Sequence, residues 1–257
     1  MDLSFGSEYS AFREEVRGFV EQYKDKQPAA PGDAMTPIEW QKLLIANGYH
    51  SRTIPKEYGG YGAEPDIVKS RIIAEEFSKA QMNTGLGGQG ITMLVPVLLE
   101  LGSEEQKQQF IKSTIEGETV WCQGYSEPGA GSDLASLTTK AVLDGDEWVI
   151  NGQKIWTSFG DVADYVWLAA RTDPHASKKH QGISMFLVPT SAPGFSFTPI
   201  NTLGVRTNAT YYENIELEDK WQVGPLNQGW RMITEQLNRE RLSLVNHGPC
   251  EKLFERV

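Results

Sequence analysis

The sequence predicts an α+β protein: an N-terminal all-α domain, a middle antiparallel β-barrel domain and the start of a C-terminal helical bundle. Three observations predict this order. Apolar residues recur at helical spacing over residues 1–118, and short β-rich runs alternate with turns over residues 119–228. Helical spacing returns over residues 229–257. We therefore expect an N-terminal helical domain, a middle β-domain and the first helix of a third domain, whose remainder is absent, in these three ranges.

The first two helices have distinct signals. The first is indicated by apolar residues at spacings of three and four, namely Phe12, Val16, Phe19, Val20 and Tyr23, which give an amphipathic helix. The second begins at Thr36-Pro37-Ile38-Glu39, because Thr36 can cap the helix and Glu39 can reach back to the capping amide. Pro37 fits the first helical position, and Asn47-Gly48 ends the helix.

Three further helices complete the expected N-terminal domain. One spans residues 67–77 and a long apolar one spans residues 91–101. The last is opened by Ser103-x-x-Gln106, a capping pattern, and stops at Gly117. At Gly229-Trp230 the helical pattern returns and runs through Leu244.

The middle segment reads as antiparallel sheet. Asp144-Gly145 and Asn151-Gly152 are dipeptides that tight hairpins require, and they predict a short strand between them at residues 148–150. Further strands are expected at residues 165–171, 183–189 and 195–200. Strands and helices do not alternate here, which argues against a dinucleotide-binding βαβ domain.

The charge and composition of the sequence argue against some classes of partner and indicate the cellular compartment. A net charge of −10 argues against nucleic acid or an anionic membrane as the main partner, since either would be repelled. The sequence contains no run of the ~20 apolar residues that a membrane span needs. The acidic start has the character of neither a secretion signal nor a transit peptide. We expect a cytoplasmic protein, or a mitochondrial matrix protein numbered after processing.

The segment Gln123 to Asp133 carries the first chemical signal. Gly129 and Gly131 let backbone amides approach a ligand closely, and Ser126 and Ser132 offer hydroxyl groups that can bond ring edges or phosphates. Taken alone, a Gly/Ser segment after a strand is also an ordinary turn.

The segment Ile150 to Ser158 carries the second signal. It places Trp156 and a pair of hydroxyl groups, Thr157 and Ser158, after a predicted strand. An indole can cover one face of a planar cofactor, because aromatic rings stack on such ligands. Taken alone, Trp156 can equally be a core residue.

Together the two segments resemble the signature segments of the acyl-CoA dehydrogenase family, through Ser126-Glu-Pro-Gly-Ala-Gly-Ser-Asp133 and Asn151-Gly-Gln-Lys-Ile-Trp156. The resemblance implies FAD as the cofactor. No metal is expected, because the cysteines and histidines do not have the spacing of metal ligands. It implies hydroxyl contacts from Ser126 to the pyrimidine side of the flavin and from Ser158 to the nitrogen that receives hydride, with Trp156 against the ring. The cofactor-binding residues it implies are Gln123, Tyr125, Ser126, Gly131, Ser132, Trp156, Thr157 and Ser158.

A third segment, Leu237-Asn-Arg-Glu-Arg-Leu242, supplies a candidate base. Ile233, Leu237, Glu240 and Leu244 fall on one helical face, which would place Glu240 in an apolar stripe. Burial would raise the pKa of this carboxyl group, as a general base near neutral pH needs. The alternative is a Glu paired with Arg241 at the margin of the stripe. The resemblance implies Glu240 as catalytic base in some family members, whereas others take it from a later loop.

For the substrate, the resemblance implies contacts from Ser132, Asn238 and Arg241. It further implies dehydrogenation of an acyl-CoA to the 2-enoyl-CoA, as in fatty-acid β-oxidation, with electrons passed to an electron-transferring flavoprotein. We also expect a homo- or hetero-oligomer, such as a homotetramer, and a natural chain longer than residues 1–257. Three alternatives stay open. The first is an acyl-CoA oxidase or flavin monooxygenase. The second is a dehydrogenase of a steroid-CoA or another bulky substrate, because Gly85, Gly87, Gly88 and Gly90 would leave room near the helix that bounds the acyl pocket in relatives. The third is a non-catalytic partner subunit.

Overall fold

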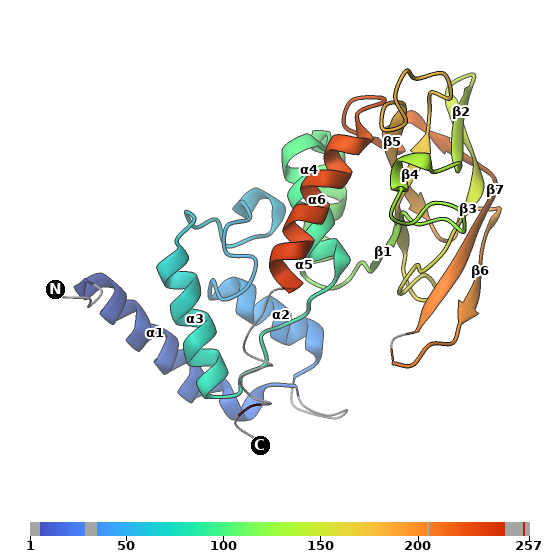
Figure 1. The fold of residues 1–257 in the computed structure, drawn as a ribbon. Helices are drawn as coiled ribbons and strands as arrows, with labels where there is room; N and C mark the ends of the chain where they lie inside the picture. Colours follow the sequence, from blue (N-terminus) through green and yellow to red (C-terminus); the bar gives the residue numbers. More distant parts are fainter. Residues whose placement is uncertain (1–5, 29–34, 205, 245–253, 255–257) are drawn as a thin grey trace. The chain divides into compact units, whose positions relative to one another are not determined.

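The computed structural model describes residues 6–28, 35–204, 206–244 and 254, and Figure 1 shows their elements. The chain divides into two compact units. One is drawn from residues 1–87 and 115–118, and the other from residues 88–114 and 119–257. Each has a hydrophobic core of its own.

The first unit contains three of the predicted helices, α1 (Ser7–Tyr23), α2 (Pro37–Ala46) and α3 (Ile67–Lys79). The apolar stripe of α1 is buried as its spacing predicts. The capping box of α2 is confirmed: Thr36 Oγ1 accepts from Glu39 N at 3.2 Å, and Glu39 Oε2 accepts from Thr36 N at 2.8 Å. Trp40 and Leu44 of α2 join the same core.

A buried carboxylate joins α1 to α3. Glu76 on α3 accepts hydrogen bonds from Arg13, from Arg17 Nε at 3.0 Å and from Lys79 Nζ at 3.1 Å. Burial alone would raise the pKa of Glu76, but these three cations outweigh burial and lower it to about 2. The pattern of apolar residues gave no indication of this cluster.

The second unit contains the helices after residue 87. The predicted helix at residues 91–101 is divided into a π-helical turn, Gly90–Leu94, and α4 (Val95–Leu101). Nearly all of α5 (Glu104–Ile115) follows, and Ser103 caps it by accepting from Gln106 N at 3.2 Å. Helix α6 (Gly229–Leu244) begins at the predicted residue, and the predicted continuation beyond Leu244 lies outside the described residues apart from residue 254.

Eight strands form the sheet of the second unit. In chain order they are β1 (Trp121–Gly124), β2 (Lys140–Asp144), β3 (Glu147–Lys154), β4 (Tyr165–Arg171), β5 (Ile183–Pro189), β6 (Phe195–Ile200), β7 (Thr207–Glu218) and β8 (Gln222–Val223). The order in space is β6-β7-β3-β2-β4-β5-β8, with β1 beside β4. Three strands, β4, β5 and β6, have the predicted bounds, whereas β1, β2, β7 and β8 were not assigned from the sequence.

The sheet corrects the expectation of an antiparallel barrel. Among the described strands no pairing joins β6 to β8, so the sheet is open. It is also mixed, because β1 runs parallel to the first half of β4 and β2 meets the end of β4 in parallel at Lys140 and Arg171. Strands β1 and β2 therefore share one edge of β4, and the Gly/Ser segment connects them. Side-chain alternation does not report strand direction, which explains the error.

The predicted turn at Asn151-Gly152 is also wrong, since β3 runs through it from Glu147 to Lys154. The dipeptide instead marks an irregularity in the pairing with β7, between Ile150 and Gly152. Asn151 Oδ1 accepts from Asn214 N of β7 at 3.0 Å. A Cβ atom at Gly152 would lie 2.4 Å from Thr139 Oγ1, so glycine is needed here for close approach. The other dipeptide, Asp144-Gly145, forms the predicted hairpin between β2 and β3.

Gly152→Ala is therefore expected to destabilise the protein by about 1–3 kcal/mol, because the new methyl group meets the backbone of Thr139. Chemical denaturation measures the change. Gly18→Ala is the matched control: Gly18 is exposed within α1 with open space around it, so this variant should gain about 0.5–1 kcal/mol. Equal stabilities of the two variants would contradict the close approach at Gly152.

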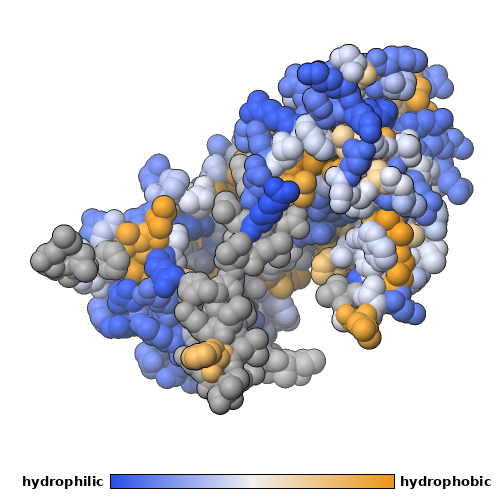
Figure 2. Space-filling model, in the orientation of Figure 1, coloured by the Kyte–Doolittle hydropathy of each residue, from blue (hydrophilic) through white to orange (hydrophobic). Residues whose placement is uncertain are grey.

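The described surface is mostly hydrophilic on the face that Figure 2 shows, with hydrophobic residues in small groups. Within the described residues, no helix combines the length and the apolar character needed to cross a bilayer.

Candidate functional site

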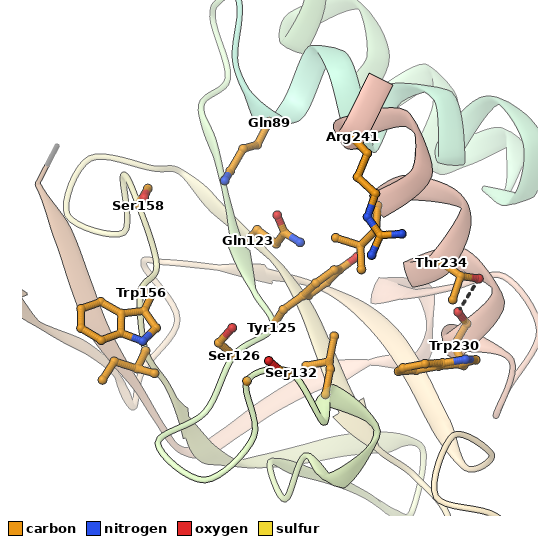
Figure 3. A pocket seen from close by; sticks show the side chains of 14 residues that line it. Gln89, Gln123, Tyr125, Ser126, Ser132, Trp156, Ser158, Trp230, Thr234 and Arg241 are labelled. Carbon is orange, nitrogen blue, oxygen red and sulfur yellow. Dashed lines mark hydrogen bonds between the residues drawn. The ribbon is translucent and has the colours of Figure 1, made fainter. Parts of the chain in front are cut away.

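A pocket of about 620 Å³ lies within the second unit. Segments far apart in the sequence line it: the turn before α4, the end of β1 and the Gly/Ser segment, the residues after β3, and α6. Figure 3 shows the lining residues, which are Gln89, Gln123, Tyr125, Ser126, Gly131, Ser132, Leu134, Ile155, Trp156, Ser158, Trp230, Thr234, Leu237 and Arg241.

Backbone hydrogen bonds fix the Gly/Ser segment at the end of β1. Glu127 N donates to Ala130 O at 2.9 Å and Ala130 N donates back to Glu127 O at 3.1 Å, which closes a tight turn around Pro128-Gly129. Ser126 O accepts from Ile155 N at 2.8 Å. This bond joins the first signature segment to the second, so Ser126 and Trp156 line one pocket.

The backbone holds Trp156 in an unusual conformation. Its φ is +62°, in the left-handed region that non-glycine residues rarely adopt, and its side chain is 58% exposed. The next residue, Thr157, is paired with Asn208 of β7 through N···O distances of 2.9 and 3.2 Å. This pairing fixes the backbone around Trp156 and leaves the indole uncovered beside the pocket. A backbone conformation that is unfavourable for a non-glycine residue is often found at ligand sites, and an exposed indole offers a face on which a flat ligand can stack.

A buried polar network supports the centre of the pocket. Trp167 Nε1 on β4 donates to Tyr125 Oη at 2.9 Å and to Gln236 Oε1 at 2.7 Å, and Tyr125 Oη also bonds Gln236. All three side chains are buried. The network fixes the end of β1 against α6, because the phenol of Tyr125 and the indole N–H of Trp167 both bond the amide oxygen of Gln236.

A buried ion pair lies beside this network. Lys154 at the end of β3 donates to Glu127 Oε1 at 3.0 Å, and both side chains are almost wholly buried. Burial lowers the pKa of Lys154 to about 8, against the opposite effect of Glu127. Burial alone would raise the pKa of Glu127, but Lys154 and hydrogen bonds from Thr138 and Thr139 outweigh burial and lower it to about 2.

Helix α6 contributes one face to the pocket. Trp230, Thr234, Leu237 and Arg241 recur at spacings of four, three and four, and Figure 3 shows Arg241 extending toward Tyr125. Glu240 lies within α6, but its side chain is outside the described residues.

The pocket gathers most of the residues that the resemblance implies. They are Gln123, Tyr125, Ser126, Gly131, Ser132, Trp156, Ser158 and Arg241. Thr157 and Asn238 do not line it: Thr157 is fully buried with its hydroxyl 3.3 Å from that of Thr210, and Asn238 is exposed on α6. Sequence reasoning missed Gln89, Leu134, Ile155, Trp230, Thr234 and Leu237. The spacing of the α6 residues could have identified three of them.

The residues present fit a flat, polar-edged cofactor. An uncovered indole offers a stacking face, and the hydroxyl groups of Ser126, Ser132 and Ser158 offer hydrogen bonds around it. The volume falls in the range of about 300–1,000 Å³ that is typical of small-molecule sites. Within the described part of the chain, no cluster of three or more His, Cys, Asp or Glu residues could hold a metal ion.

Comparisons with known proteins cover nearly the whole chain. Residues 6–118 match the family described as acyl-CoA dehydrogenase, N-terminal domain, and residues 122–219 match acyl-CoA dehydrogenase, middle domain. Acyl-CoA dehydrogenase FadE26 of Mycobacterium tuberculosis is 46% identical over 198 residues, which are 76% of this chain and 48% of that protein. A short-chain-specific acyl-CoA dehydrogenase of Clostridium acetobutylicum is 33% identical, over 95% of this chain and 65% of that protein.

Solved structures agree with the sequence relatives. The ChsE4–ChsE5 complex of Mycobacterium tuberculosis matches with a TM-score of 0.71 and 37% identity, over 93% of this chain and 61% of that one. A structure named Tcur3481-Tcur3483 steroid ACAD matches with a TM-score of 0.72 and 40% identity, over 95% and 64%. The chain thus spans about half to two-thirds of the length of these relatives.

Proposed function

Because the chain belongs to the acyl-CoA dehydrogenase family, we propose that the protein uses FAD to convert an acyl-CoA thioester to the corresponding 2-enoyl-CoA. The observation that carries the proposal is that both signature segments line the same pocket. The uncovered indole of Trp156 lies in this lining together with the hydroxyl groups of Ser126, Ser132 and Ser158. The mycobacterial and clostridial relatives favour a bacterial cytoplasm over a mitochondrial matrix.

The wall of the pocket would hold the cofactor. Trp156 would pack against the flavin ring, Ser126 and Ser158 would donate hydrogen bonds to its edges, and Ser132 would lie near the diphosphate and the CoA. Gln123, Tyr125 and Gly131 complete this wall, and Thr157 fixes the backbone of its neighbours. Bound FAD would supply the hydride acceptor for the β-carbon of the substrate.

Two residues of α6 would act on the substrate. Arg241, which lines the pocket, would contact it, whereas Asn238, the other contact predicted on this helix, does not line the pocket. Glu240 would remove the proton next to the thioester carbonyl. That proton is weakly acidic, so hydrogen bonds to the carbonyl oxygen must stabilise the negative charge that develops as the proton leaves. This task requires a pKa near neutrality, which burial of the Glu240 carboxyl group would give.

A bulky acyl group is the substrate class that we favour. One structural relative at 40% identity is named a steroid ACAD, and Gly88 comes directly before the pocket residue Gln89. Gly88 has open space where a Cβ atom would lie. The expected room is absent at Gly85 and Gly90, where a Cβ atom would lie 2.4 Å from Gln41 and 2.5 Å from Trp121. Since two relatives form two-component structures, a hetero-oligomer is the assembly that we propose. An electron-transferring flavoprotein would accept the electrons.

The test is an anaerobic titration of the purified yellow protein with acyl-CoA esters, from straight-chain to steroid-bearing. We expect flavin absorbance to bleach, with formation of the 2-enoyl-CoA and the strongest response to a bulky ester. Rapid reoxidation of the reduced protein by oxygen would instead indicate an oxidase or monooxygenase. Protein that stays colourless with added FAD would indicate a non-catalytic subunit.

A further inference from the structure

The buried ion pair between Lys154 and Glu127 lies behind the pocket wall without being part of it. The side chain of Lys154 is 0% exposed and that of Glu127 is 4% exposed. Neither residue lines the pocket, yet the neighbours of each do: Tyr125 and Ser126 precede Glu127, and Ile155 and Trp156 follow Lys154. The pair therefore influences the pocket only through these neighbours.

The carboxylate of Glu127 is fully engaged by hydrogen-bond donors. Its Oε2 accepts from Thr138 N and from Thr138 Oγ1, each at 2.7 Å. Its Oε1 accepts from Thr139 N at 2.8 Å and from Lys154 Nζ at 3.0 Å. Three donors besides the ammonium group therefore stabilise the carboxylate, and all three come from the segment that leads into β2.

The ammonium group of Lys154 has a second acceptor. Its Nζ donates to the carbonyl oxygen of Tyr125 at 3.0 Å. That oxygen belongs to the peptide between Tyr125 and Ser126, two residues that line the pocket. A cation on a carbonyl oxygen in a buried, low-dielectric setting polarises the peptide, which makes its N–H group, that of Ser126, a stronger donor.

We infer that Lys154 is a positioning residue that acts through the Tyr125–Ser126 peptide, and that it makes the pocket favour the reduced, negatively charged form of the cofactor over the oxidised form. The inference rests on the proposed function. Two-electron reduction of a flavin by hydride leaves negative charge on its pyrimidine side, the side at which Ser126 is expected. The polarised N–H group of Ser126 stabilises such a charge, whereas the direct field of the ammonium group is offset by the carboxylate of Glu127 3.0 Å away.

A purely structural role has a different signature. If Lys154 only held the two segments together, its loss would weaken the binding of oxidised and reduced cofactor alike, and the reduction potential would not move. If Lys154 acts by charge, its loss weakens the reduced form more, and the potential becomes more negative. The reduction potential therefore separates the two roles.

The experiment compares Lys154→Met and Lys154→Gln with the wild-type holoprotein. Methionine removes the charge and both hydrogen bonds. Glutamine removes the charge but keeps an N–H donor, so the Lys154→Gln variant is measured in its place if the Met variant does not fold. We expect about a tenfold loss of preference for reduced over oxidised FAD in either variant, which is a shift of about 30 mV to more negative potential for a two-electron couple. Equilibration with a reference dye measures it, and fluorescence titration of the apoprotein measures the affinity for oxidised FAD.

Glu76→Gln is the matched control, because Glu76 is also a buried carboxylate held by cations but belongs to the other compact unit. It should lower stability and leave the potential unchanged. A folded Lys154 variant that binds FAD with the wild-type potential would overturn the inference and leave the proposed function intact. Wild-type protein that takes up no FAD would overturn the proposed function itself.

Discussion

Glu240→Gln is expected to lower the rate of substrate-dependent flavin bleaching by about 10²–10⁴-fold, the usual contribution of a positioned general base. Glutamine has nearly the shape of glutamate but cannot accept the proton that leaves the substrate. The affinity for FAD should stay the same, because the wall formed by Ser126, Trp156 and Ser158 is untouched. Stopped-flow absorbance with the best acyl-CoA ester measures the rate.

Glu235→Gln is the control on the same helix. Glu235 is paired with Arg231 at 2.8 Å, one turn away, and does not line the pocket. Its variant should bleach within about twofold of the wild-type rate, since an exposed pair of this kind contributes only about 0.3–0.5 kcal/mol. If the Glu240 variant behaves like the Glu235 variant, the base lies elsewhere in the protein.

Lys154→Met is expected to lower the free energy of unfolding by about 3–5 kcal/mol at pH 7, because it leaves the carboxylate of Glu127 buried without its cation. The loss should also loosen the wall of the pocket, since Lys154 joins the end of β3 to Tyr125 and Glu127. Denaturation in urea, followed by tryptophan fluorescence, measures the stability.

The pH dependence provides a check on this interpretation. In the wild type, the pKa of Glu127 is lowered to about 2, so its contribution to stability is fully present above its ordinary pKa and is lost progressively as the pH falls from there through about 2. Without Lys154 the pKa of Glu127 should rise. As the pH falls, Glu127 of the variant then becomes protonated, which removes the unpaired buried charge and restores part of the variant's stability. The difference in stability between wild type and variant should thus be smaller at pH 4 than at pH 7.

The double variant Lys154→Met/Glu127→Gln tests the pairing itself. Each single variant leaves one buried charge without its partner, whereas the double variant leaves none. The double variant should therefore be destabilised by less than the sum of the two single changes. Additive effects would contradict a direct interaction between Lys154 and Glu127.

Local signals predicted the helices well. The capping boxes at Thr36 and Ser103 were readable because a helix start depends on residues three positions apart. The stripe of α1 was readable because one face of a helix repeats within the segment itself. The turn at Asp144-Gly145 was predicted because a tight hairpin turn depends on two adjacent residues. A similar dipeptide at Asn151-Gly152 instead forms an irregularity within β3.

The sequence by itself determined the order of helical and β-rich segments, the helix starts and the two motifs that carry the resemblance, because each depends on residues that are neighbours along the chain. Only the tertiary structure decided that β1 lies parallel to β4, that the sheet stays open, that Lys154 reaches Glu127 and Tyr125, and that Gln89 and the face of α6 join the motifs around one pocket. These features depend on contacts between residues far apart in sequence. Such contacts are selected by packing and burial of the whole unit, which no local pattern encodes.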